Sequence, residues 1–194
     1  MQISIKGKQL AVGEALRIHA EQSLTSLVAK FFDKAIGATV VLSREAFNFR
    51  VDITVHPFRG IIVQGSGVAS EAYAAFDTAM HRIERQLRRY KGRFFDHKTK
   101  GEVVEAQYSI IAVQEENNKE EDTVPDDTPI IVAEMSAEIP ICSVSGAVMR
   151  LNLANVAAIL FRNSVHGRLN MVYRRSDGNI GWIDPQCDEN SKSM

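Results

Sequence analysis

The sequence has few of the residues that would tie the chain to a metal, a disulfide framework or a membrane. Its 194 residues include only two cysteines, Cys142 and Cys187, and neither lies in a Cys-x-x-Cys pair or beside a histidine cluster. Two such cysteines make neither a disulfide framework nor a zinc ligand set, so we expect two reduced thiols. No apolar run approaches the ~20 residues that cross a bilayer, and the N-terminus lacks the apolar stretch of a secretory signal. We therefore expect a cytoplasmic protein with no membrane partner.

Catalytic and cofactor-binding patterns are also missing. The sequence has no glycine-rich phosphate loop, nucleophile elbow or His-Glu-x-x-His motif. Its histidines are scattered, at His19, His56, His81, His97 and His166. His81 and Glu84 could form a metal or acid–base pair, but helix-surface pairs of this kind are usually structural. We therefore predict no catalytic residues, metal, cofactor or small-molecule substrate, and keep a small cytosolic enzyme only as an alternative.

Charge is distributed unevenly, although the formal net charge of the whole chain is only −1. Residues 1–100 carry 16 Lys and Arg against 9 Asp and Glu, a net charge of +7. Residues 101–194 carry 7 against 15, a net charge of −8. A basic half favours a polyanionic partner, although charge alone leaves an ordinary solvated surface as an equal alternative.

The chain begins with a strand pattern followed by a helix pattern. Ile3 and Ile5 alternate with polar residues, which predicts a short strand with one apolar face. Apolar residues then recur at three- and four-residue spacing, which predicts a helix over residues 13–34. Gly13 is an acceptable N-cap for this helix, and Gly37 is expected to end it.

Three strands and a second helix complete the first domain. The strands are predicted over residues 39–43, 47–55 and 61–64. The middle strand alternates clearly and should bury one side, formed by Phe47, Phe49, Val51, Ile53 and Val55. Ser70 is expected to cap the second helix, whose buried face should consist of Tyr73, Phe76, Met80, Ile83, Leu87 and Tyr90. The prediction is an α+β domain of order β-α-β-β-β-α, with both helices on one face of an antiparallel sheet.

An acidic segment separates this domain from the rest of the chain. Residues 114–129 carry seven acidic residues, one lysine and two prolines, with Val124 as the only aliphatic side chain. Such a segment cannot pack a core and is expected to be a self-repelling tether. We therefore predict an acidic flexible linker over residues 101–128, within which residues 103–113 could form a stray strand.

A small second α+β unit is expected over residues 129–194. Residues 130–133 predict a strand, and residues 143–153 predict a short helix capped by Ser143. Further strands are predicted over residues 155–161, 168–174 and 179–183, with a tight turn at residues 176–178. A unit of this size struggles to bury enough apolar surface alone, and pairing with a second copy would relieve that.

The strongest chemical signal is a basic stretch in the second helix. Residues 82–93 hold six basic residues against Glu84, and helical spacing places Arg82, Arg85, Arg88 and Arg89 opposite the apolar face. Planar, always-charged guanidinium groups suit phosphate oxygens. An ordinary solvated helix face is the alternative, but the net charge of +7 in residues 1–100 favours nucleic acid. Two helices on one sheet face are also similar to the double-stranded-RNA-binding architecture, which favours RNA.

Residues 1–95 resemble the ribosome hibernation-promoting factor and ribosome-associated inhibitor family. The matching segments are QISIKGKQLAVGEALR, KFF with the following TVVLS, and GSGVASEAYAAFDTAMHRIERQLRRYKGR. The stretch LFRNSVHGRLNMVYRRSDGNIGWIDP is similar to the dimerisation domain of the family's long forms. A general double-stranded-RNA-binding protein is the alternative, but it would have no need for the second domain.

The resemblance implies a non-enzymatic role in stress. The first domain, residues 1–100, is expected to bind ribosomal RNA in the decoding region of the small ribosomal subunit and to block mRNA and tRNA. The residues predicted to contact RNA are Lys6, Lys8, Arg82, Arg85, Arg88, Arg89, Lys91 and Arg93. The second domain, residues 129–194, is expected to form a homodimer that joins two inactive ribosomes.

The predicted dimer surface comes from the strands of the second domain. Leu169, Met171 and Tyr173 share one face of strand 168–174, and Val172 lies on the other. One face should cover the domain's own helix, and the remaining apolar edge should be free for a second copy. The residues predicted at the dimer interface are Ile159, Phe161, Met171, Val172 and Tyr173.

Overall fold

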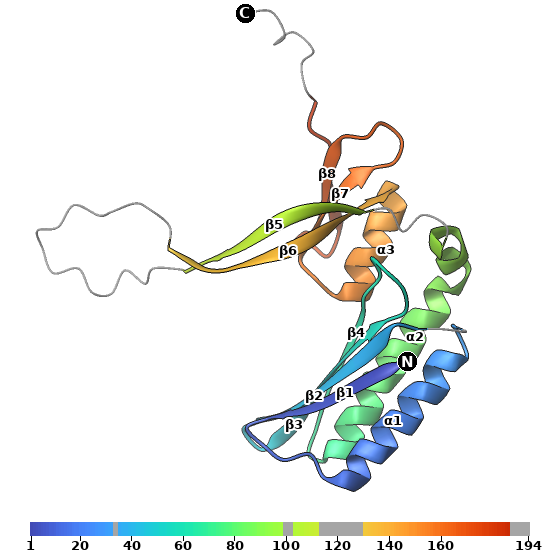
Figure 1. Cartoon of the computed structure of the whole chain (residues 1–194), viewed down its shortest axis with the longest axis vertical. Coiled ribbons are helices and arrows are strands. Elements are labelled where there is room, and N and C mark those ends of the chain that lie inside the picture. The colour runs from blue at the N-terminus through green and yellow to red at the C-terminus, as the bar shows by residue number, and fades with distance from the viewer. Residues whose placement is uncertain (33–34, 99–102, 113–129, 187–194) are drawn as a thin grey trace, which may run out of the picture.

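The computed structural model describes residues 1–32, 35–98, 103–112 and 130–186, with side chains described up to residue 92 of the helix that ends at residue 98. These residues form two sheets, one of four strands and one of five, with helices packed against each (Figure 1). The α+β class predicted for the chain is confirmed. None of the helices in the described part of the chain is long and apolar enough to cross a membrane.

The first sheet has the strand order β1-β2-β3-β4. Its strands are β1 (Gln2–Lys8), β2 (Gly37–Glu45), β3 (Asn48–His56) and β4 (Val63–Ala69). The sheet is mixed, so the prediction of a wholly antiparallel sheet is wrong: β1 pairs with β2 in parallel, and the other two pairings are antiparallel. A helix lies between β1 and β2 in the chain, and such a crossover returns the chain to the sheet in the same direction.

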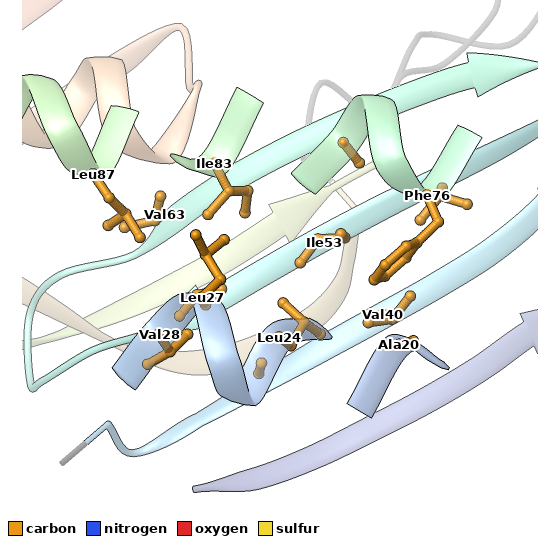
Figure 2. Packing of buried hydrophobic residues seen from close by; sticks show 14 of the residues in the cluster. Ala20, Leu24, Leu27, Val28, Val40, Ile53, Val63, Phe76, Ile83 and Leu87 are labelled. Carbon is orange, nitrogen blue, oxygen red and sulfur yellow. The ribbon is translucent and has the colours of Figure 1, made fainter. Parts of the chain in front are cut away.

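Two helices cover one face of this sheet, as predicted (Figures 1 and 2). Helix α1 (Glu14–Ala29) has Gly13 at its N-cap but ends at Ala29, several residues before the predicted end, and Gly37 belongs to β2. Helix α2 (Ala72–Lys98) begins after Glu71, whose carbonyl oxygen accepts the first helical hydrogen bond from Ala75 at 3.0 Å. The prediction that Ser70 is the cap is therefore wrong by one residue.

The first core lies between the two helices and the sheet. Figure 2 shows it formed by Ala20, Leu24, Leu27 and Val28 of α1, by Val40, Ile53 and Val63 of the sheet, and by Phe76, Ile83 and Leu87 of α2. Phe47 does not take part, although the alternation predicted it would. It is 90% exposed because it lies in the turn between β2 and β3, next to Ala46 with a positive φ of 51°. Tyr73, at the start of α2, is also 44% exposed.

The close approach of α2 to β4 depends on two glycines. A Cβ at Gly67 would collide with the carbonyl oxygen of Ala75 and lie 2.7 Å from the amide nitrogen of Ala79. A Cβ at Gly65 would lie 2.7 Å from the side chain of Ile83. Since backbone cannot give way as a flexible side chain can, glycine is required at Gly67 for the helix to pack at this distance.

The second sheet has the strand order β5-β6-β7-β8-β9. Its strands are β5 (Val103–Ile111), β6 (Ile131–Cys142), β7 (Ala158–Asn163), β8 (Leu169–Arg174) and β9 (Ile180–Ile183). Helix α3 (Val144–Ala154) follows β6, and the hydroxyl of Ser143 accepts a hydrogen bond from the amide of Gly146 at 3.2 Å, as predicted for its cap.

Strand β5 corrects the predicted linker. The linker is predicted over residues 101–128 with a possible stray strand over residues 103–113, and residues 103–111 do form a strand, which pairs antiparallel with β6 along its whole length. The acidic stretch over residues 113–129 lies outside the described residues. The alternating side chains of β5 find a partner strand that stands about twenty residues away in the sequence, which local composition could not indicate.

Helix α3 contributes to both cores. Ala147 and Leu151 belong to the core of the second domain, whereas Met149 and Leu153 belong to the core of the first. All four side chains are fully buried. The two domains are therefore packed against each other along α3.

Polar contacts accompany this packing. The Nε of Arg150 donates to the carbonyl oxygen of Gly60 at 3.1 Å, and the amide of Asn152 donates to the hydroxyl of Tyr90 at 3.2 Å. Burial lowers the pKa of the Arg150 guanidinium, and the effect of Cys142 opposes this shift. The Arg150 guanidinium thus loses part of its hydration when it packs between the two domains, and this destabilises its charged form.

We predict that Gly67→Ala destabilises the first domain by about 1–3 kcal/mol, because the new methyl group would force α2 away from β4. Chemical denaturation of the full chain would measure the change. The control is Gly92→Ala in α2, where a Cβ meets nothing within 4 Å. That change should stabilise the helix by about 0.5–1 kcal/mol. Equal stability of Gly67→Ala and the wild type would contradict the close packing of α2 on β4.

Candidate nucleic-acid interface

Helix α2 presents a row of arginines to solvent, as predicted. We call Arg82, Arg85, Arg88 and Arg89 the arginine row; all four are exposed. The opposite side of the helix is buried, with Ile83 and Leu87 fully covered. The row spans about 10 Å along the helix axis at 1.5 Å per residue. Its contact with RNA remains a prediction.

Two arginines of the row are held by neighbouring polar side chains. Arg88 donates to the carboxylate of Glu84 one turn earlier at 2.8 Å, and this hydrogen bond lowers the pKa of Glu84. Arg82 donates to the hydroxyl of Ser66 on the edge strand β4 at 3.2 Å. The Arg88 side chain remains 72% exposed, so the ion pair orients its guanidinium without removing it from solvent.

Aromatic rings support two further cations. The guanidinium of Arg89 lies 5.4 Å from the ring centroid of Tyr90, and the ammonium of Lys91 lies 5.9 Å from that of Phe31. Both distances are within the range of cation–π attraction, which is worth about 0.5–1 kcal/mol at exposed sites. The aliphatic stems can pack on the domain while the charges stay available to a ligand.

The structure does not bring all predicted RNA-contacting residues together. Lys6 and Lys8 are exposed on β1, at the sheet edge opposite the β4 edge that Arg82 contacts. With β2 and β3 between these edges, they are about 14 Å apart at 4.8 Å per strand. Arg93 lies in α2, but its side chain is outside those described. The two lysines thus lie apart from the arginine row.

One cation beside the row was not predicted. Lys30 follows the last residue of α1, and its charge contributes to lowering the pKa of Glu84 on α2. The C-terminal end of α1 and the basic half of α2 therefore meet. A lysine at the end of a helix is a signal that could have indicated this position, but the helix was predicted to continue to residue 34.

His81 and Glu84, considered above as a metal-binding or acid–base pair, have other charged neighbours in the structure. The Glu84 carboxylate is engaged mainly by Arg88, and His81 is the smallest of the influences that lower its pKa. Within residues 1–32, 35–98, 103–112 and 130–186, no three His, Cys, Asp or Glu side chains gather closely enough to hold a metal ion. Glu84 is thus placed as an ion-pair partner within the basic surface.

The predicted dimer surface needs correction. Phe161 and Val172 were expected at an interface, but both are fully buried in the core of their own domain, and Ile159 packs against that core. Met171 and Tyr173 lie on the opposite face of the sheet. Leu160 and Ile183 pair with Met171 on either side and share this face. Both faces of these strands carry apolar residues, so alternation alone could not decide which one the helix covers.

We call this second face the outer face, formed by Leu160, Leu169, Met171, Tyr173 and Ile183. Leu160, Leu169 and Ile183 are 46%, 43% and 44% exposed. Tyr173 lies across β9, where its ring occupies the space that a Cβ at Gly181 would need. A sheet face with this many half-exposed apolar side chains is typical of a protein interface.

A polar network missed by the sequence analysis joins the ends of β7, β8 and β9. The buried Asn170 accepts at its side-chain oxygen from the amide of Asn163 and from the indole of Trp182, each at 3.0 Å. Its own amide donates to the carboxylate of Asp184 at 2.9 Å, which lowers the pKa of that group. The network satisfies buried polar groups and fixes the register of the three strands.

Comparisons with known proteins agree with this arrangement of two domains. Residues 3–94 match the family described as sigma 54 modulation protein / S30EA ribosomal protein, and residues 126–181 match the family described as its C terminus. The solved N-terminal domain of protein Y from Thermus thermophilus aligns with 46% of this chain and 99% of that domain, at 32% identity and a TM-score of 0.41.

Relatives of similar length match across the whole chain. The ribosome hibernation promotion factor of Bradyrhizobium diazoefficiens is 36% identical over 192 residues, covering 95% of each chain. That of Rhizobium meliloti is 36% identical over 185 residues, covering 95% of this chain and 97% of the relative. The chain therefore belongs to the S30EA family of ribosome hibernation promotion factors and has the long-form architecture, with both the N-terminal and the C-terminal domain.

Proposed function

We propose that this chain is a non-enzymatic hibernation factor that binds the decoding region of the small ribosomal subunit, blocks mRNA and tRNA there, and joins two ribosomes through paired C-terminal domains. The observation that carries the proposal is the exposed arginine row on a folded domain of a family member. The names of the relatives support a ribosomal role.

The arginine row suits ribosomal RNA because it offers charge without base-reading pockets. Guanidinium groups bind phosphate oxygens through paired hydrogen bonds, and a row of them can follow an RNA backbone of any sequence. Lys30 and Lys91 extend the positive surface where α1 meets α2. Structured RNA is recognised largely by shape and backbone, which such a surface can do.

The outer face of the second sheet supports pairing with a second copy. An isologous dimer uses the same patch twice, so an apolar patch is matched by itself. Removing apolar surface from water contributes about 25 cal/mol per Å², so covering several half-exposed leucine-sized side chains on each copy lowers the free energy of association. The small size of the domain makes such coverage valuable.

We predict that ribosome binding falls steeply with salt and that Arg85→Glu/Arg89→Glu weakens it strongly. Each lost phosphate contact should reduce the slope of log affinity against log salt by about 1, so the double variant should reduce it by about 2. Co-sedimentation with small subunits over a salt series gives both quantities.

The comparison variant is Lys6→Glu/Lys8→Glu, which changes the net charge of the same domain equally but at the far sheet edge, where two further RNA contacts are predicted. We expect a smaller loss with this variant, because ammonium groups do not make the paired hydrogen bonds that guanidinium groups make with phosphate. Equal losses would contradict the assignment of the row as the main contact. Equally tight binding of wild type to ribosomes and to arbitrary double-stranded RNA would favour a general RNA-binding protein instead.

The dimer is tested by two neighbouring residues on opposite faces of β7. Leu160→Glu places a charge on the outer face and should give a folded monomer, because the side chain is already half in water. Phe161→Glu buries an unpaired charge in the domain core and should unfold the second domain, at several kcal/mol. Light scattering and circular dichroism of the full chain separate the two results.

The wild type should be a dimer at micromolar concentration in the same measurement. A wild-type monomer, or a Leu160→Glu chain that dimerises as well as the wild type, would contradict pairing through the outer face. Leu160→Glu should still bind single ribosomes through the first domain.

A further inference from the structure

Strands β5 and β6 form a ribbon with two chemically distinct faces. Cross-strand pairs put on one face Val104, Ala106, Tyr108 and Ile110 of β5 and Ala133, Met135, Ala137 and Ile139 of β6. All eight are uncharged and predominantly apolar. The other face is mainly polar and acidic, with Val103 and Pro140 only at its base; it carries Glu105, Gln107, Ser109, Glu134, Ser136 and Glu138. The ribbon is therefore amphipathic, and we call the first set its apolar face.

The ribbon projects from the second domain (Figure 1), and part of its apolar face is exposed. Tyr108, Ile110 and Met135 are 52%, 39% and 48% exposed. Nearer the body of the protein, Ala106 and Ile139 line a cavity of about 760 Å³ shared with the first domain. An isolated two-stranded ribbon is marginally stable in water, so a surface that covers its distal half would stabilise it.

The apolar face continues the outer face of the same sheet. Near its end β6 pairs with β7, where Cys142 stands beside Asn163 and Ile141 beside Arg162. Cys142 is buried with Phe161 in the domain core, so the odd-numbered residues of β6 lie on the side of Leu160. The unpartnered ribbon surface and the proposed dimer surface are thus one continuous sheet face.

We propose that the apolar face of the β5–β6 ribbon docks on a second copy of this chain and extends the dimer interface. This inference rests on the proposed pairing of C-terminal domains and adds to it a strand that neither family match covers, because β5 lies between residues 3–94 and 126–181. In chain order, β5 is the part of the proposed interface that follows the first domain most directly.

Charge selects a second copy over RNA as the partner. The apolar face carries no cation that could bind a phosphate backbone, and of the acidic residues behind it Glu138 is paired with Arg59 of the first domain at 2.7 Å. In a two-fold dimer the two apolar faces meet while both acidic faces point away, so no like charges are brought into contact. Continuity with the outer face means that the same two-fold axis can serve both surfaces.

The test uses the full chain and two adjacent positions on opposite faces of β6. Met135→Lys should raise the dimer dissociation constant by at least about tenfold, because each dimer contains two copies of the change. Ser136→Lys, on the acidic face, should leave it within about twofold of wild type. Analytical ultracentrifugation measures the constants, and Leu160→Glu serves as the reference for loss of the proposed dimer.

Amide hydrogen exchange of the wild type gives a second readout that needs no variant. The ribbon amides of residues 104–110 and 133–139 should become more protected as the concentration rises through the dissociation constant. Loss of the dimer in Leu160→Glu with wild-type dissociation in Met135→Lys and unchanged ribbon protection would overturn the inference and leave the proposed function standing. A wild-type monomer would overturn both. A Met135→Lys dimer of wild-type strength that binds ribosomes more weakly would show that the ribbon faces the ribosome instead.

Discussion

The packing of α2 against β4 sets the rotation of this helix about its axis, and the position of the basic surface follows from it. Gly67 allows the backbone of β4 to approach that of α2 so closely that no side chain fits between them. With Ile83 and Leu87 fixed in the core, the arginine row has only one direction in which to point. The RNA contact proposed for this row requires such a rigid support.

Helix α3 has a corresponding role between the domains. Its two apolar stripes are buried in two different cores, so the second domain is packed on the first rather than held only by the chain between them. The connection between the two domains is also short, because only residues 99–102 separate the end of α2 from the start of β5. The position of the second domain relative to the first thus depends on two contacts, the pairing of β5 with β6 and the docking of α3 on the core of the first domain. Two fully buried side chains of α3, Met149 and Leu153, dock it on the core of the first domain, whereas no residue of β5 is fully buried.

The opposite charges of the two halves have separate physical uses. Positive charge is concentrated on the exposed side of α2, where Glu84 orients Arg88 and only partly offsets the charge of the row. Negative charge described in the second half lies largely on one side of the β5–β6 ribbon, leaving the other side apolar. Segregation of this kind keeps the basic surface of α2 apart from the apolar face of the ribbon, as the two proposed roles, RNA binding and self-pairing, require.

The sequence by itself determined the first domain's element order, the exposure of the arginine row and the acidic character of the second half. These follow from local periodicity: a helix that must bury Ile83 and Leu87 exposes Arg85 and Arg89 whatever it packs against. The tertiary structure decided the rest. It put Phe161 rather than Leu160 in the core, paired β5 with β6, separated Lys6 from the arginine row and brought Lys30 beside it. Each of these depends on which segments distant in the sequence meet, and strands with apolar residues on both faces pack equally well by local criteria until a helix covers one of them.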